Sequence, residues 1–153
     1  MQDIPAEQAD DDLHYIYDNR VRYAETDAQG VVFYGEYVTY QDETTSELLR
    51  RLDHPYESFA DLGVDLHVVH TDVDYRATAA FDDRLTNGIR VERFGESSVT
   101  FAWACRRRDD GEVVATGHVT HVAVDDETRE PTRVPESFRS AVRSFQDVPP
   151  VTE

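Results

Sequence analysis

The pattern of apolar and polar positions changes its period along the chain, and each change marks a different element. Between Tyr15 and Tyr23 apolar and polar side chains alternate, which predicts a half-buried strand. From about residue 35 to 52 the apolar positions recur at helical spacing instead. This stripe consists of Tyr37, Tyr40, Thr44, Leu48 and Leu52, with Leu49 beside it. The helix is expected to end at Asp53-His54-Pro55, because a residue before proline disfavours helical backbone.

The second half of the chain predicts strands. In the strand that begins near Val64, the alternation switches parity between Val68 and Val69, which predicts a bulge or a sharp twist. Three more strands are expected around 85–91, 99–105 and 113–124, the last two joined by a hairpin turn at Asp109-Asp110-Gly111. Pro135 is placed to start a short terminal helix. The element order is therefore one strand, one long helix and four long strands, followed by a short helix.

With 153 residues, the chain is long enough for one domain with a real core. We expect this single domain over residues 14–146, a mobile acidic tail over 1–13 and a C-terminal tail over 147–153. No apolar run is long enough to span a bilayer, and the acidic N-terminus lacks the features of a signal peptide. These features favour a cytoplasmic protein without membrane contact. The single cysteine, Cys105, agrees with a reducing compartment because it has no partner for an internal disulfide.

Composition changes this picture through charge. The formal net charge is -17, and all fifteen basic residues are arginines. Replacement of lysine by Asp and Glu is what adaptation to a cytosol of molar salt produces, where charges are screened within about 3 Å. In dilute buffer the same charge density repels itself. The charge also argues against a nucleic-acid partner, because the chain offers no broad basic face for phosphates.

A halophilic protein is expected to depend on salt for its fold. Far-UV circular dichroism recorded from dilute buffer to molar KCl should show native structure only at high salt, because screening removes the repulsion among carboxylates. A spectrum unchanged on dilution would contradict the halophilic interpretation and favour an acidic protein from an ordinary organism.

The segment from Arg22 to Tyr37 contains the strongest chemical signal. Asp27 lies between the predicted strand and the predicted helix, beside Gly30 and an aromatic run. A turn that leads into a helix brings a side chain and free helix N–H groups to one point, which suits attack on a carbonyl. The structural alternative is that Asp27 caps the helix or closes an Asx-turn, a common role for aspartate.

These residues resemble the signature of the hotdog-fold acyl-CoA thioesterases, in the 4-hydroxybenzoyl-CoA thioesterase branch that includes the tol-pal-associated thioesterases. In that branch an aspartate precedes a small pair, a glycine, two aliphatic residues, an aromatic residue and a tyrosine that opens the helix. The positions that fall on this pattern are Asp27, Gly30, Val31, Val32, Phe33 and Tyr37. The resemblance covers about residues 15 to 140 and implies an α+β hotdog fold, an antiparallel sheet wrapped around a long central helix.

The resemblance also implies the reaction, hydrolysis of an acyl-CoA thioester to a carboxylic acid and coenzyme A. Asp27 would attack the carbonyl to form a mixed anhydride or would activate a water, and the sequence leaves both routes open. The oxyanion donor would be the backbone N–H of Tyr34 at the mouth of the helix. Gly30, Val31, Phe33 and Tyr37 would contact the substrate. No cofactor is implied, since coenzyme A is part of the substrate.

The start of the helix departs from the family's pattern. Relatives often have histidine at the position of Tyr34 and asparagine at that of Glu36. A tyrosine hydroxyl offers a weaker donor than histidine, so the resemblance does not carry an acid or orienting role over to this position. Glu36 is either a second carboxylate of the site or a favourable anion in the first helical turn. Asp42 either contacts the site or partner subunit, or is a solvated helix carboxylate.

Coenzyme A brings phosphates to an acidic protein, so local arginines are needed to bind them. The densest cluster is Arg106-Arg107-Arg108 at the end of the predicted hairpin, and we take its Arg106 and Arg107 as candidate phosphate ligands, with Arg76 as a second candidate. The alternative is that this cluster balances the acidic residues of the neighbouring turn.

Neither the paired histidines nor the single cysteine predicts a functional site. The pairs His67/His70 and His118/His121 have metal-ligand spacing for a helix, but both lie in predicted strands. A step of three residues in a strand points side chains to opposite faces, so we predict no metal site. Cys105 lies on an alternating apolar face and is predicted to be a core residue rather than a nucleophile.

Two other classes of function stay open. A hydratase or dehydratase on the same fold would require a histidine and a carboxylate near the thioester, and the segment from Arg22 to Tyr37 contains no histidine. A non-catalytic acyl-CoA-binding module would not need an attacking carboxylate.

The resemblance further implies a homodimer or homotetramer with sites at subunit contacts, and such pairing would cover the edges of long strands.

Overall fold

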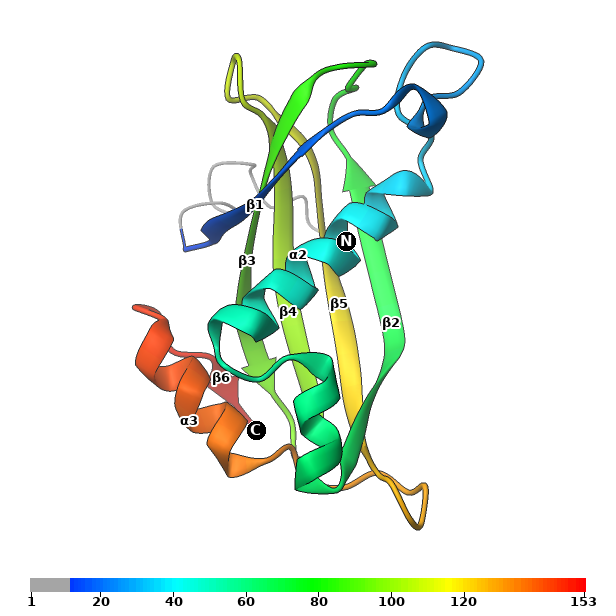
Figure 1. The fold of residues 1–153 in the computed structure, drawn as a ribbon. Helices are drawn as coiled ribbons and strands as arrows, with labels where there is room; N and C mark the ends of the chain where they lie inside the picture. The colour runs from blue at the N-terminus through cyan, green and yellow to red at the C-terminus, as the bar shows by residue number, and fades with distance from the viewer. Residues whose placement is uncertain (1–11) are drawn as a thin grey trace.

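The fold is a single antiparallel sheet wrapped around one long helix, as Figure 1 shows. This computed structural model describes residues 12–153, so the predicted tail over 1–13 lies almost entirely outside the described residues. The strands are β1 (His14–Arg20), β2 (Val64–Tyr75), β3 (Arg84–Phe94), β4 (Ser98–Arg107), β5 (Val113–Asp125) and β6 (Val151–Thr152). The helices are α2 (Glu36–Arg51) and α3 (Glu136–Phe145), with 3-10 turns η1 (Tyr23–Glu25) and η2 (Tyr56–Leu62).

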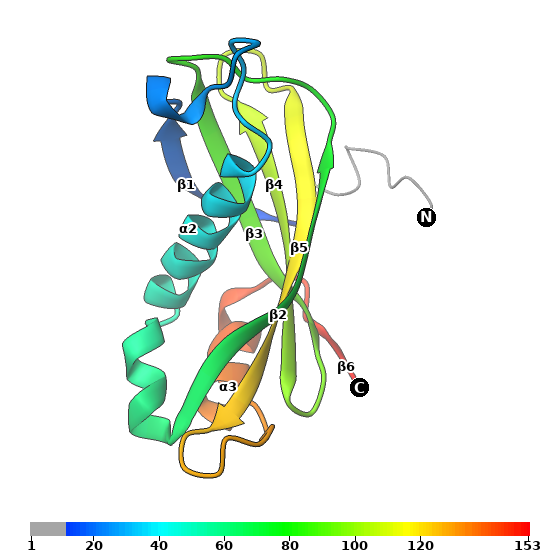
Figure 2. The same cartoon turned by 90° about the vertical axis from the view of Figure 1, so that its right-hand side faces the viewer.

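The sheet has the strand order β1-β3-β4-β5-β2, with antiparallel pairing throughout and the short β6 added in parallel to β3. Figure 2 shows α2 and α3 on the same side of this sheet. The predicted hotdog architecture is therefore confirmed. β1 and β2 are the edge strands of the sheet. The segment between β1 and α2 passes over one end of the sheet and contains Asp27 (Figure 1).

Most sequence-predicted elements are confirmed. The apolar stripe of the long helix is buried, with Tyr37 and Tyr40 each 3% exposed and Leu48 fully covered. The switch of parity in β2 coincides with a register shift against β5 between Val68 and His70, which is the predicted bulge. The terminal helix α3 follows Pro135 as expected.

Two predictions at the element ends were wrong. Tyr23 does not continue the first strand: β1 ends at Arg20, and Tyr23 lies in η1 with 77% of its surface exposed. The alternation of side chains persisted into the turn by coincidence, and pattern alone cannot distinguish a strand from the 3-10 turn that follows it. The segment 147–153 is not wholly a tail, because Val151 and Thr152 pair with Arg93 and Phe94 of β3.

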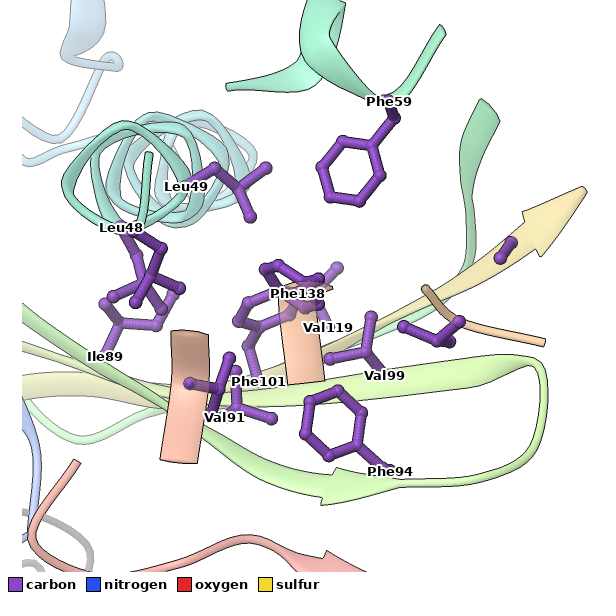
Figure 3. Packing of buried hydrophobic residues seen from close by; sticks show 14 of the residues in the cluster. Leu48, Leu49, Phe59, Ile89, Val91, Phe94, Val99, Phe101, Val119 and Phe138 are labelled. Atoms are coloured by element: carbon purple, nitrogen blue, oxygen red, sulfur yellow. The ribbon is translucent and has the colours of Figure 1, made fainter. Parts of the chain in front are cut away.

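The core consists of two adjoining clusters between the sheet and the helices. Figure 3 shows the larger cluster, where side chains of α2 and α3 meet the inner faces of β3, β4 and β5. Leu48, Phe101 and Phe138 at its centre are completely buried. The smaller cluster, around Tyr37 and Trp103, lies beneath the first turns of α2. Apolar burial here holds the start of α2 against the end of the sheet that bears the candidate site.

Two histidines of β5 lie on opposite faces of the sheet and have pKa values shifted in opposite directions. His118 is on the outer face between Asp72 at 3.2 Å and Glu92 at 3.5 Å, and these carboxylates raise its pKa to about 9. His121 is 2% exposed in the core, packed on Phe101, and burial lowers its pKa to about 4.

These shifts predict how stability depends on pH. Because the folded pKa of His121 lies below the unfolded value of 6.5, the unfolded chain binds more protons between pH 6.5 and 4, and stability is lost as pH falls through this window. For His118 the folded pKa is raised, so its contribution is complete below pH 6.5 and is lost as pH rises toward 9. The free energy of unfolding, measured with denaturant at a series of pH values, should fall less at acid pH in His121→Leu than in the wild type. In His118→Gln it should fall less at alkaline pH. Variants with the same pH dependence as the wild type would contradict these two pKa shifts.

Over the described residues, no helix combines the length and the apolar character needed to cross a membrane.

Candidate active site

Asp27 lies at the start of a tight hairpin turn between η1 and α2. Its backbone N–H donates to the Val31 carbonyl at 2.9 Å, and its carbonyl accepts from Gly30 at 3.0 Å. Thr26 and Val32 pair across the hairpin. Gly30 has a φ of 79°, a left-handed conformation that glycine adopts without strain, which is the reason for a glycine at this position. The sequence prediction of a single turn from strand to helix is thus corrected: a hairpin is inserted before the helix.

The Asp27 carboxylate is partly exposed, and only one of its oxygens is engaged within the described residues. Oδ1 accepts the Gln29 N–H at 2.8 Å, which closes an Asx-turn. Oδ2 accepts no hydrogen bond from residues 12–153. The structural alternative considered from sequence is therefore present. It does not consume the carboxylate, because the second oxygen is available to a substrate or a water.

The mouth of α2 provides unpaired backbone donors beside this hairpin. Val32 and Phe33 donate to the carbonyls of Ala79 and Glu25, and regular helix begins at Glu36. Between them, the N–H groups of Tyr34 and Gly35 have no acceptor among the described residues. Free N–H groups at the positive end of a helix stabilise a developing negative charge. The predicted oxyanion donor, Tyr34 N–H, is therefore available for that role.

Gly35 leaves room for the Phe33 ring at the helix mouth. A Cβ atom at this position would lie 2.9 Å from that ring, so the ring, which is 43% exposed, would have to shift. The Phe33 ring also contacts the Tyr34 ring, with centroids 4.4 Å apart. The glycine thus lets the Phe33 ring lie against the start of the helix.

Sequence reasoning missed Glu25, which anchors the hairpin. The residue is 7% exposed, and its carboxylate accepts hydrogen bonds from the Tyr40 hydroxyl at 3.0 Å and the Arg22 N–H at 2.9 Å. The Arg22 guanidinium contacts its other oxygen at 3.2 Å. Because Tyr40 belongs to α2, Glu25 fixes the chain two residues before Asp27 to the helix. The available clue was Tyr40 itself, since a tyrosine on a buried stripe needs a partner for its hydroxyl.

Exposed aromatic side chains surround the hairpin. All the exposed aromatic residues of the described chain lie in segments around this end of the sheet, and they are Tyr23, Phe33, Tyr34, Tyr75 and Phe81. The Tyr75 hydroxyl, at the end of β2, donates to the Tyr34 carbonyl at 3.0 Å. Tyr23 and Phe81 meet edge to face with centroids 5.9 Å apart. Exposed apolar surface gathered in one region is typical of a ligand-binding or protein-binding surface.

The other predicted site residues are distributed unevenly. Val31 is in the hairpin and pairs with Ala80. Tyr37 is 3% exposed and packs between Tyr40 and Tyr75, so its burial argues for holding the helix rather than for touching substrate. Glu36 lies in the first turn of α2, whereas Asp42 is exposed farther along it.

The predicted phosphate ligands are largely engaged elsewhere. Arg107 is bound by Asp110 at 2.9 Å and by Glu112, and it also donates to the Thr78 carbonyl. These partners raise the pKa of its guanidinium, which stays charged. Arg106 lies over the Tyr15 ring, 5.6 Å from its centroid. The arrangement of Arg107 matches the alternative in which the run balances the acids of the neighbouring turn.

Cys105 and the histidine pairs have structural positions. Cys105 is completely buried, and burial raises the pKa of its thiol, so it is not poised as a nucleophile. His118 and His121 face opposite sides of the sheet, as expected from a three-residue step. For His67 and His70 this expectation was wrong, because the bulge between Val68 and His70 sets them opposite Val122 and Thr120, which share one face of β5, and both histidines are exposed. The part of the chain that the structure describes brings together no group of three side chains able to hold a metal ion.

The geometry therefore provides a carboxylate with one available oxygen in the hairpin, free N–H groups at the helix mouth that directly follows the hairpin, and exposed aromatic side chains in the neighbouring segments. A thioester needs an attacking group and a donor for its carbonyl oxygen. Its leaving thiolate is the base of an acid with a pKa of about 8.5, so a strong general acid is not required. The fold and this site define a hotdog-fold thioester hydrolase.

Known proteins that resemble this chain in sequence and in fold are also thioesterases. The model of the thioesterase-like superfamily matches residues 21–142, and the chain belongs to this family. A 1,4-dihydroxy-2-naphthoyl-CoA hydrolase from Prochlorococcus marinus is 30% identical over 118 residues, which cover 72% of this chain and 77% of that protein. The solved structure of a gentisyl-coenzyme A thioesterase superposes with a TM-score of 0.73 at 25% identity, covering 82% of this chain and 98% of that one.

A second solved structure, a 1,4-dihydroxy-2-naphthoyl-CoA thioesterase from Synechocystis, has a TM-score of 0.79. It covers 88% of this chain and 98% of the other, and its 20% identity speaks for the fold alone. The protein is thus a thioester hydrolase of the acyl-CoA thioesterase family.

Proposed function

We propose that this protein hydrolyses an aryl-CoA thioester, with Asp27 as nucleophile or general base and the Tyr34 N–H as oxyanion donor. The observation that carries the proposal is the placement of the available Asp27 oxygen in a hairpin next to the unpaired N–H groups of the helix mouth. In a site that excludes water, such donors stabilise the oxyanion without reorganisation at the moment of reaction. Either route, anhydride or activated water, uses the same groups.

The aromatic surroundings support an aromatic acyl group. Phe33, Tyr34 and Tyr75 provide ring faces and edges next to the hairpin, and aromatic pairs are favourable in offset or edge-to-face contact. The relatives that share this chain's fold include hydrolases named for dihydroxynaphthoyl-CoA and gentisyl-CoA, both hydroxylated aryl thioesters. The substrate class we propose is therefore a hydroxylated aryl-CoA.

A panel of thioesters tests the substrate class. Purified protein in molar KCl, given benzoyl-, hydroxybenzoyl-, dihydroxynaphthoyl- and straight-chain acyl-CoA, should release free thiol with the highest kcat/KM on the hydroxylated aryl substrates. A preference of about tenfold corresponds to roughly 1.4 kcal/mol of differential transition-state binding, within reach of one or two aromatic contacts. Equal rates on hexanoyl- and hydroxybenzoyl-CoA would contradict the aryl assignment while leaving hydrolysis itself intact.

We also propose that the active form is a homodimer or homotetramer, with β2 at the contact. β2 is a long edge strand, and Val68 and Val69 on it are 53% and 60% exposed. Edge strands of this kind are open to pairing with another chain. Light scattering should give at least twice the 17.5 kDa mass of one chain. A monomer that retains full activity would contradict this assembly.

A further inference from the structure

Three arginines lie side by side at the end of the sheet that bears the Asp27 hairpin. Arg20 at the end of β1 and Arg84 at the start of β3 are direct cross-strand partners. Arg108 follows β4, and its N–H donates to the Arg84 carbonyl at 2.8 Å. With Asp18 and Asn19, these side chains line one groove of about 310 Å³. We call Arg20, Arg84 and Arg108 the arginine row.

The arginine row places like charges next to one another, and carboxylates balance them only in part. Like charges directly opposite on paired strands destabilise a sheet, and a chain with 32 acidic and 15 basic residues has little reason to gather arginines. Nearby carboxylates balance part of the charge, through Arg20–Asp82 at 3.1 Å and Arg108–Asp18 at 3.3 Å. All four of these side chains are about half exposed, and such exposed pairs are weak enough to exchange.

The central member of the row is the one best placed to receive a ligand. Arg84 is exposed, and it forms no ion pair with any residue from 12 to 153. A guanidinium presents a rigid fork of N–H donors that matches a phosphate in bidentate geometry. With Arg20 on one side and Arg108 on the other, a phosphate at Arg84 would have three cations within the same groove.

Backbone hydrogen bonds connect the arginine row to the Asp27 hairpin. Val21 and the pair Asp82–Asp83 exchange hydrogen bonds of 2.9 Å, and Ala80 just before them pairs with Val31 in the hairpin. A second hollow lies at the opposite end of the sheet, between the start of β2 and the end of β5. Its lining has four carboxylates and one arginine, Arg133, which is paired with Glu96 and Glu136, so the hollow as a whole repels an anion.

We propose that the arginine row binds a phosphate group of the coenzyme A moiety of the substrate, with Arg84 as its central ligand. This inference rests on the proposed function, since it assigns the far end of the same substrate. It moves the phosphate site from Arg107, whose guanidinium is held by Asp110 and Glu112, to a row formed by Arg20 of β1, Arg84 of β3 and Arg108 just after β4. An acidic protein would thereby offer its polyanionic substrate a local patch of opposite charge.

Calorimetric titration with coenzyme A, 3′-dephospho-coenzyme A and pantetheine tests the site without turnover. The titrations belong at the lowest salt that preserves the fold, because salt screens exposed charges. Arg84→Gln should raise the Kd for coenzyme A about tenfold relative to its Kd for pantetheine, the size expected for a charge-assisted hydrogen bond. Arg84→Lys should lose less, because it keeps the charge. Arg93→Gln is the matched control, since Arg93 is on the same strand at the opposite end and pairs with Glu153.

The outcomes separate this inference from the proposed function. An equal loss in Arg84→Gln and Arg93→Gln, or an equal effect on coenzyme A and pantetheine, would overturn the arginine row as the phosphate site. So would inorganic phosphate competing as well as coenzyme A, because the row would then be a general anion site. Coenzyme A binding that depends on Arg84, in a protein that releases no thiol from any thioester, would support the row and reject the proposed function instead.

Discussion

Asp27→Asn is expected to lower kcat for thioester hydrolysis by about 10²–10⁴-fold, the contribution of a positioned general base. The amide cannot attack the carbonyl or accept a proton from water. Its Oδ1 can still accept the Gln29 N–H, so the Asx-turn and the hairpin survive. We therefore expect an inactive enzyme with wild-type stability, measured by thiol release and by denaturant unfolding.

Asp27→Ala is the matched variant that separates chemistry from structure. Alanine removes the carboxylate and the acceptor for Gln29 together, so this variant should be as inactive as Asp27→Asn and less stable by about 1 kcal/mol. If Asp27 served only to close the turn, asparagine would replace it well and alanine poorly. Near-normal turnover in Asp27→Asn with loss in Asp27→Ala would therefore show that Asp27 is a structural residue.

Glu25→Ala is expected to give the largest loss of stability near the site, about 2–4 kcal/mol in the free energy of unfolding. The change removes the acceptor for the Arg22 N–H, its guanidinium and the Tyr40 hydroxyl. A buried donor left without an acceptor costs about 1–3 kcal/mol, and hydrogen bonds to a charged group exceed neutral ones. Because Glu25 positions the hairpin, kcat should also fall, though less than in Asp27→Asn.

Tyr40→Phe provides the control for Glu25. It removes one hydrogen bond to the carboxylate and leaves the Arg22 contacts in place, so a loss of about 1 kcal/mol is expected. In the double variant the two losses should not add, because residues in one hydrogen-bond network are coupled. Additive losses in denaturant unfolding would show that Glu25 and Tyr40 act independently and that the hairpin is not anchored through α2.

Features set by local periodicity were predictable from the sequence. The stripe from Tyr37 to Leu52 specified α2, and the parity switch at Val68 and Val69 specified the bulge in β2, because both depend on which side chains share a face. The position of Asp27 at a turn was predictable for a similar reason, since Gly30 marks a left-handed residue.

Features set by contacts between distant segments were not predictable. Tyr40, the partner of Glu25 on α2, lies fifteen residues away, and the arginine row joins residues of β1 and β3 to the residue that follows β4. β6 is two residues long, too short for any period, and exists because β3 offers it an edge at Arg93 and Phe94. In each case the missing information was the register of one element against another, which no single stretch of sequence contains.

Hydrolysis of thioesters at the Asp27 hairpin is tested most directly by measuring both products of one reaction. Wild-type protein and hydroxybenzoyl-CoA are incubated in molar KCl, and free thiol and carboxylic acid are quantified together, beside Asp27→Asn. We predict one equivalent of acid for each equivalent of coenzyme A, with at least about 10²-fold less of both from the variant. Substrate that is bound but recovered intact, or consumed without release of thiol, would contradict the claim and favour a binding module or a hydratase.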